Sequence, residues 1–235
     1  MKKYLLFIVE GNNDKREMQA MLRASCGNAF TDNFVDAYHV HETDITCEKD
    51  EKKIIGALND IVLSWRNGGE KPFQKIPVSD VARIIHVIDT DGAFIPDSAV
   101  KQTDDAKAQY YDKSICFFDR NKIVGLHHRK IKVINKLLET KTIDNIPYSI
   151  YFSSCNMDHV LFNERNPIRS QKDRGSFEFA IKCKNRDYLN SSIFAPDVAA
   201  SGTYSESWEM IQKDYNSLAR HTNLNLLLDG VIIGK

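Results

Sequence analysis

The sequence lacks both a long apolar segment and an excess of charge of either sign. No apolar run approaches the roughly 20 residues that a membrane-spanning helix requires, so we expect none. Lysine plus arginine and aspartate plus glutamate number 32 each, which argues against a basic coat for nucleic acids but leaves room for a local basic groove. The apolar run after Met1 stops at Glu10, too early for the core of a signal peptide.

Cysteine is sparse and scattered. The five cysteines form no C-x-x-C pair, so we expect no zinc site and a reduced, cytoplasmic location. A G-x-x-x-x-G-K-[ST] phosphate-binding loop is also missing, which weakens a kinase interpretation. With 42% hydrophobic and 27% charged residues among 235, the composition is typical of a globular chain with a substantial core.

Two apolar runs, Tyr4–Val9 and Ile84–Ile88, each end next to acidic residues. Continuous aliphatic and β-branched runs are typical of strands buried on both faces of a parallel sheet. Glu10 follows the first run, and Asp89 and Asp91 follow the second. If the strands are neighbours, the three carboxylates converge where parallel sheets place their active crevice. Such a cluster needs a cation, and an oxygen-preferring ion, Mg2+ or Mn2+, fits best.

The rest of the chain alternates between helical and strand patterns, which predicts an α/β protein with a Rossmann-like parallel sheet and right-handed crossovers. Helices are predicted over 14–23, 54–65 and 128–138, strands over 34–40 and 148–153, and an irregular polar segment over 92–117. Further helices are predicted over 156–163, 176–188 and 204–219. We therefore expect an α/β core, residues 1–154, and a helical C-terminal extension, residues 155–235, packed on it.

The stretch Phe7-Ile8-Val9-Glu10-Gly11-Asn12-Asn13-Asp14 and the later Asp89-Thr90-Asp91 together resemble the Toprim family. That family places a glutamate after its first strand and Asp-x-Asp after a later one, and Glu10, Asp89 and Asp91 match these positions. The resemblance extends to about Ser154 and is greatest to stand-alone OLD-type and anti-phage Toprim nucleases. It implies a Mg2+- or Mn2+-dependent nuclease of antiviral defence that acts on RNA or DNA with a separate ABC-type ATPase. It leaves open whether the chain forms a homodimer.

The individual acids each have alternative interpretations. Glu10 either binds the metal or moves a proton as general acid/base, the role that the resemblance favours, or else pairs with the dipole of the following helix. Alternation along an extended segment would point Asp89 and Asp91 to opposite faces, but a bend at Gly92 can aim both at one ion; the alternative is that they are ordinary solvated loop acids. Asp14 is either a site residue or a first-turn helix acid.

The segment after the fourth predicted strand adds further candidates. Asp158 is a candidate metal ligand, and His159 a weaker candidate for the same site. Asn156 is expected to cap a helix. His86, inside a buried strand, is expected to be a hydrogen-bonded core histidine.

Two stretches, 120–132 and 165–186, are rich in basic residues. Arg129, Lys130 and Lys132 are candidates for phosphate contacts, and Phe177 and Phe179 for stacking on bases. The alternative for each is a solvated helix face or an ordinary core aromatic. The sequence thus favours a nucleic-acid phosphodiesterase, with a non-catalytic Toprim-fold interaction subunit or another Mg2+-dependent phosphoryl-transfer enzyme as alternatives.

Overall fold

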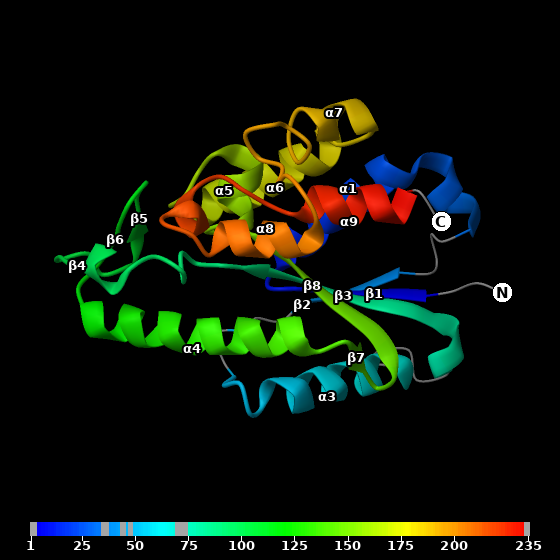
Figure 1. The fold of residues 1–235 in the computed structure, drawn as a ribbon. Helices are drawn as coiled ribbons and strands as arrows, with labels where there is room; N and C mark the ends of the chain where they lie inside the picture. Colours follow the sequence, from blue (N-terminus) through cyan, green and yellow to red (C-terminus); the bar gives the residue numbers. More distant parts are fainter. Residues whose placement is uncertain (1–3, 34–37, 43–45, 47–48, 69–74, 233–235) are drawn as a thin grey trace.

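A central sheet organises the protein in a computed structural model that describes residues 4–33, 38–42, 46, 49–68 and 75–232 (Figure 1). In the described residues its strand order is β2-β1-β3-β8-β7. These strands are β1 (Tyr4–Val9), β2 (Tyr38–Glu42), β3 (Val81–Asp89), β7 (Thr142–Ile143) and β8 (Ile146–Ser153). The first four in this order are parallel, whereas β7 pairs with β8 in the antiparallel sense. The predicted Rossmann-like α/β class is confirmed, and the sheet has in addition the antiparallel edge strand β7, which the sequence did not predict.

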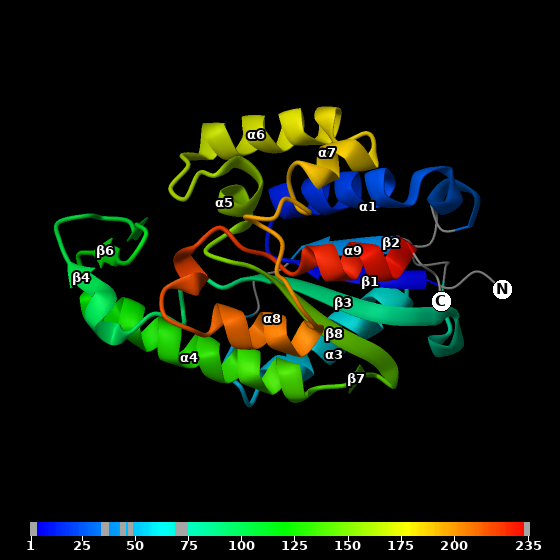
Figure 2. The same cartoon turned by 45° about the horizontal axis from the view of Figure 1, so that its top comes forward.

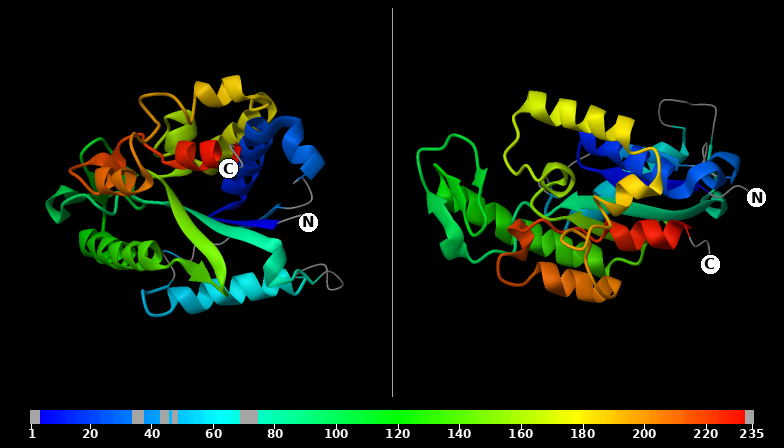
Figure 3. Two further views of the ribbon diagram at one scale, coloured as in Figure 1. Left: turned by 45° about the vertical axis from the view of Figure 1, so that its right-hand side comes forward. Right: turned by 90° about the horizontal axis from the view of Figure 1, so that it is seen from above.

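Helices cover both faces of the sheet (Figures 1 and 3). On one face lie α3 (Ile54–Arg66) and α4 (Arg120–Glu139); on the other side lie α1 (Asn12–Asn33), α5 (Met157–Phe162), α6 (Arg169–Lys182), α7 (Arg186–Asn190) and α9 (Leu224–Ile232). Helix α8 (Tyr204–Ile211) packs Trp208 edge-on against Phe152, within the core cluster that includes α3 and α4. Short 3-10 turns are η1 (Val78–Asp80), η2 (Asp97–Ala99) and η3 (Asn216–Leu218). No helix within the described ranges is both long and apolar enough to cross a membrane.

The predicted helices of the first 154 residues are confirmed, although α1 and α4 are longer than predicted. The helix predicted over 156–163 is α5, and Asn156 caps it by accepting the His159 N–H at 2.9 Å. The single helix predicted over 176–188 is wrong, because α6 and α7 are separated by residues 183–185. The helix predicted over 204–219 ends at Ile211. Part of the strand predicted over 34–40 lies outside the described residues.

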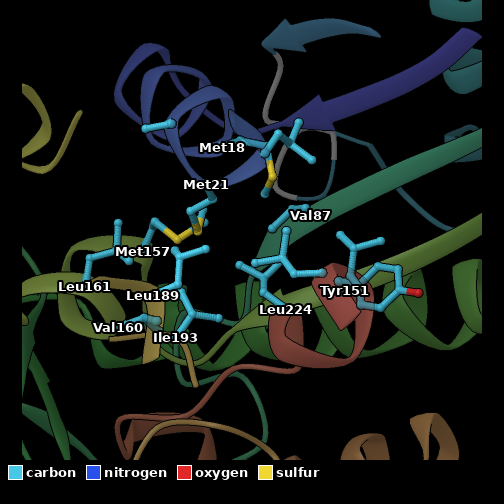
Figure 4. Close-up of a cluster of buried hydrophobic side chains, with 14 of the residues drawn as sticks. Met18, Met21, Val87, Tyr151, Met157, Val160, Leu161, Leu189, Ile193 and Leu224 are labelled. Carbon is cyan, nitrogen blue, oxygen red and sulfur yellow. The ribbon is translucent and has the colours of Figure 1, made fainter. Parts of the chain in front are cut away.

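Side chains of the C-terminal segment, residues 155–235, belong to the same buried core as the side chains of the sheet. Val87 of β3 packs in one buried cluster with Met18 of α1, Val160 of α5 and Leu224 of α9 (Figure 4). Thr222 also forms a bridge with Ser153 at the end of β8. Burial of such side chains contributes roughly 1.5–3 kcal/mol each, so both parts of the chain stabilise one shared core.

The segment predicted to be irregular, residues 92–117, contains a small second sheet. Its strands are β4 (Val100–Gln102), β5 (Gln109–Tyr110) and β6 (Ile115–Phe117), in the order β4-β6-β5. Figure 2 shows this sheet beyond the carboxyl end of β3, beside the first turns of α4. It therefore extends the protein at the edge where the sequence predicts the site.

Candidate functional site

The two acid-bearing strands are neighbours. β1 and β3 are parallel and adjacent, with Leu6 opposite Ile84 and Ile8 opposite His86. Glu10 follows β1 directly, and Asp89 is the last residue of β3. Because parallel strands end at the same edge, the predicted adjacency of the two motifs is confirmed.

A buried lysine joins the acids of the two strands. Lys130 of α4 is 3% exposed, and its Nζ lies 3.7 Å from Glu10 Oε1 and in contact with Asp91 Oδ2. The Thr46 hydroxyl donates a hydrogen bond to Glu10 Oε1 at 2.9 Å. Lys130 therefore contacts one carboxylate that follows β1 and one that follows β3, so Glu10 and Asp91 lie close to each other.

A bend after β3 turns Asp91 towards this lysine. Asp91 has a φ of 50°, in the left-handed region, and Gly92 follows with a φ of 68°. The Thr90 N–H donates to the Ser153 carbonyl and the Asp91 N–H to the Cys155 carbonyl, both at 2.9 Å. The chain thus leaves β3 bound to the end of β8, and the alternation that would separate Asp89 from Asp91 is broken.

Gly92 is required at this bend. A Cβ there would lie 2.6 Å from Leu218 Cδ2 and 2.9 Å from Ile115 Cδ1, and the positive φ would strain any other residue.

We expect Gly92→Ala to lower the free energy of unfolding by roughly 2–4 kcal/mol, measured by urea denaturation. Gly125→Ala, in α4 where an added Cβ would meet no atom within 4 Å beyond the adjoining residues and backbone of its own helix, should instead stabilise slightly. Equal effects of both substitutions on the free energy of unfolding would contradict the requirement for glycine at position 92.

Negative charge is in excess around Asp89. Burial, followed by the charges of Glu10, Asp14 and Asp91, raises the pKa of Asp89 well above its ordinary value, against the lowering effect of Lys130. The pKa of Asp14 is raised to about 6 by burial and by the charge of Asp158. Asp14 therefore belongs to the acidic region, beyond any part it plays in the first turn of α1.

A second set of acids adjoins the first through Asp14. Asp158 is buried and pairs with Lys172 at 2.9 Å. Burial raises the pKa of Glu17 well above its ordinary value, with Asp14 and Asp158 adding to the shift. The sequence predicted a place for Asp158 at this edge but gave no indication of Glu17, which reads as an ordinary helix residue.

His86, His127 and His159 are buried in different surroundings. His159 is buried, and burial followed by the charges of Arg165 and Arg220 lowers its pKa to about 4, so it is neutral near pH 7. His86 Nδ1 lies 2.9 Å from the Tyr148 hydroxyl, which confirms the predicted core histidine. Burial lowers the pKa of His127 to about 4, although the charge of Asp91 acts to raise it.

The predicted basic patch on α4 divides into two parts. Lys130 is buried among the acids, whereas Arg129 and Lys132 are exposed. The three therefore do not form one surface for phosphate. Phe179 is buried in the core and has no face free for a base, while Phe177 is exposed beneath the Arg16 guanidinium, 3.9 Å from the ring centroid.

A cavity of about 480 Å³ adjoins Asp89 and Asp91. Tyr110 of β5 and Asn156 at the start of α5 contribute to its lining. Four basic residues also line it, Lys107, Arg165, Arg169 and Lys172. The sequence showed the basic excess of residues 165–186 but not this pocket, because Lys107 and Tyr110 come from the segment predicted to be irregular.

The donor chemistry of the acids fits a hard divalent cation. The acids that converge here offer only carboxylate oxygens, and their charge exceeds that of Lys130. Within the described residues, however, no group of three or more histidine, cysteine, aspartate or glutamate side chains is arranged to hold a metal ion. Glu10, Asp89 and Asp91 would therefore have to draw closer together than they lie beside Lys130.

Comparison with protein-family models, with curated proteins and with solved structures found no significant match. The functional interpretation therefore depends on the residues and their geometry.

Proposed function

We propose that the protein is a metal-dependent phosphodiesterase of the Toprim type that acts on nucleic acid. The observation that carries this proposal is the approach of Glu10 and Asp91 to one buried cation, Lys130 Nζ, at the shared carboxyl edge of β1 and β3. Such carboxylates lie at the edge where parallel sheets bind ligands, and carboxylate oxygens are the ligands that Mg2+ and Mn2+ prefer. The antiviral role and the separate ATPase partner that the resemblance implies belong to the same proposal.

The residues divide the chemistry between them. Asp89 and Asp91, with Asp158 as a further candidate, would hold Mg2+, which when bound polarises a phosphate oxygen and stabilises the leaving oxygen. Glu10 would accept or donate the proton; Thr46 and Lys130 hold its Oε1, and its side chain is 11% exposed, which supports this role. Lys130 orients Glu10 and Asp91 relative to each other.

Mg2+ should raise the melting temperature of the wild-type protein. At about tenfold excess over its Kd, an ion that binds only the folded state contributes about 1.4 kcal/mol, or roughly 3–6 °C for a chain of this size. Asp89→Ala should leave the fold intact or slightly stabilise it without metal, because it removes a buried, repelled carboxylate. Its Mg2+-dependent shift should be much smaller, which differential scanning fluorimetry measures.

Asp60→Ala provides the matched control. Asp60 is exposed on α3, away from the cluster, so its variant should retain the wild-type Mg2+ shift. Equal shifts in the wild type, Asp89→Ala and Asp60→Ala would show that Mg2+ acts elsewhere on the protein.

A second candidate function is a non-catalytic interaction subunit. It is favoured by Lys130, whose ammonium already neutralises part of the acidic cluster and lies between Glu10 and Asp91. In that case the cluster is a structural ion-pair network. The absence of any site-dependent Mg2+ shift, together with no cleavage, would support this alternative.

A further inference from the structure

The cavity beside Asp89 and Asp91 combines two kinds of charge. The acids lie at the end of β3, and the basic side chains come from the segment before β5, the loop before α6 and the start of α6. A phosphodiester group is recognised by such basic side chains, while its reaction requires the metal-binding acids. The cavity therefore places phosphate recognition next to the proposed chemistry.

Hydrogen bonds and an ion pair connect the two segments that line the cavity, the one around β5 and the loop before α6. The Asn166 side chain accepts the Tyr110 N–H at 2.8 Å and donates to the Tyr110 carbonyl at 2.9 Å, so it pairs with β5 as a neighbouring strand would. Arg165 Nη2 also contacts Asp112 Oδ1 at 2.6 Å. These bonds fix Tyr110 against the loop that precedes α6, so the cavity is built by specific contacts.

Two of the basic side chains remain available for an anion. Arg165 pairs with Asp112 and Lys172 with Asp158, whereas Lys107 and Arg169 are exposed and form no ion pair with any residue that the structure describes. Tyr110 is the aromatic residue of the lining, and it is half-buried where it packs against the core cluster that includes Val100 and Ile115. Stacking on an aromatic ring accepts any base and contributes roughly 1–3 kcal/mol per base.

We infer that this cavity, within the proposed nuclease, holds one nucleotide of a single-stranded nucleic acid, with its phosphate between the β3 acids and Lys107 and Arg169 and its base on Tyr110. A volume of about 480 Å³ is in the range of pockets for small ligands. A single strand can place one nucleotide there, whereas a duplex would have to unpair first. The substrate class is thus single-stranded nucleic acid, DNA or RNA.

Binding of a labelled single-stranded oligonucleotide, measured by fluorescence anisotropy over a salt series, tests this assignment. All proteins carry Glu10→Gln and are measured with Mg2+ present, so that binding is read without cleavage. We expect Lys107→Ala/Arg169→Ala to weaken binding about tenfold and to reduce the slope of log K against log salt by about 0.7, the value for one neutralised phosphate on a single strand. Lys107→Arg/Arg169→Lys should retain most of the affinity.

Lys136→Ala/Lys141→Ala is the control, because it removes the same two positive charges from a different place. Both lysines are exposed near the C-terminal end of α4, away from the cavity. Equal weakening by both double variants, or tighter binding of the matching duplex than of the single strand, would overturn the inference. Cleavage by a protein with Lys107→Ala/Arg169→Ala and intact Glu10 at the wild-type rate and affinity would overturn it while leaving the nuclease proposal standing. Selective loss of binding in a protein that cleaves nothing would support the nucleotide site and refute only the nuclease proposal.

Discussion

Glu10→Gln should abolish strand cleavage while most of the affinity for nucleic acid remains. The amide keeps the size of the carboxylate and can still accept the Thr46 hydroxyl hydrogen bond, but it can neither take up the proton nor carry the charge. Loss of a general acid/base lowers the rate by roughly 10²–10⁴-fold. Single-turnover cleavage and equilibrium binding on the same oligonucleotide separate the two effects.

Glu178→Gln is the control for this substitution, because Glu178 is exposed on α6 and pairs only along its own helix with Arg174 and Lys182 among the described residues. It should cleave at the wild-type rate. Undiminished cleavage by Glu10→Gln would refute the role assigned to Glu10, and parallel loss of binding and cleavage would show that Glu10 holds the substrate instead.

Lys130→Met should be strongly destabilising. The Lys130 side chain is 4% exposed, and its removal leaves Glu10 and Asp91, with Asp89 nearby, without the compensating charge. Breaking a buried ion pair from one side costs roughly 3–5 kcal/mol. We expect about 3 kcal/mol, the lower end, because Asp91 keeps 31% exposure and water can solvate it. Urea denaturation without divalent cations measures the loss.

Lys132→Met provides the comparison two residues further along the same helix. Lys132 is exposed, so its substitution should change the free energy of unfolding by no more than about 0.5 kcal/mol. If the acids can take up Mg2+, then Mg2+ should restore more stability to Lys130→Met than it adds to Lys132→Met. Indistinguishable stabilities of the two variants without metal would contradict the account of Lys130.

The sequence was sufficient to predict the parts of the fold that depend on local pattern. The run Tyr4–Val9 is β1 to the residue, and the run at 84–88 lies within β3, because strands buried on both faces carry continuous apolar residues. Strand β7 was missed since two residues show no alternation, although Asp144 and Asn145, with φ of 49° and 62°, form the turn typical of a hairpin.

The candidate site was predictable only where its residues follow strands. Glu10 and Asp89 follow apolar runs, so their meeting depends on one assumption, that the strands are neighbours. Lys130 lies in a helix of many basic residues, and nothing local distinguishes it from exposed Lys132. Tyr110 reaches the site through its pairing with Asn166, a contact between distant segments that no sequence period indicates.

The most direct test of the central claim is strand cleavage by the wild-type protein as Mg2+ or Mn2+ is titrated against single-stranded and duplex DNA and RNA. We predict cleavage of single strands that requires the metal, is stopped by EDTA and is absent from Asp89→Ala, whose fold is verified by its melting curve. Cleavage that persists in EDTA, or that Asp89→Ala performs at the wild-type rate, would contradict a metal-dependent site formed by these acids.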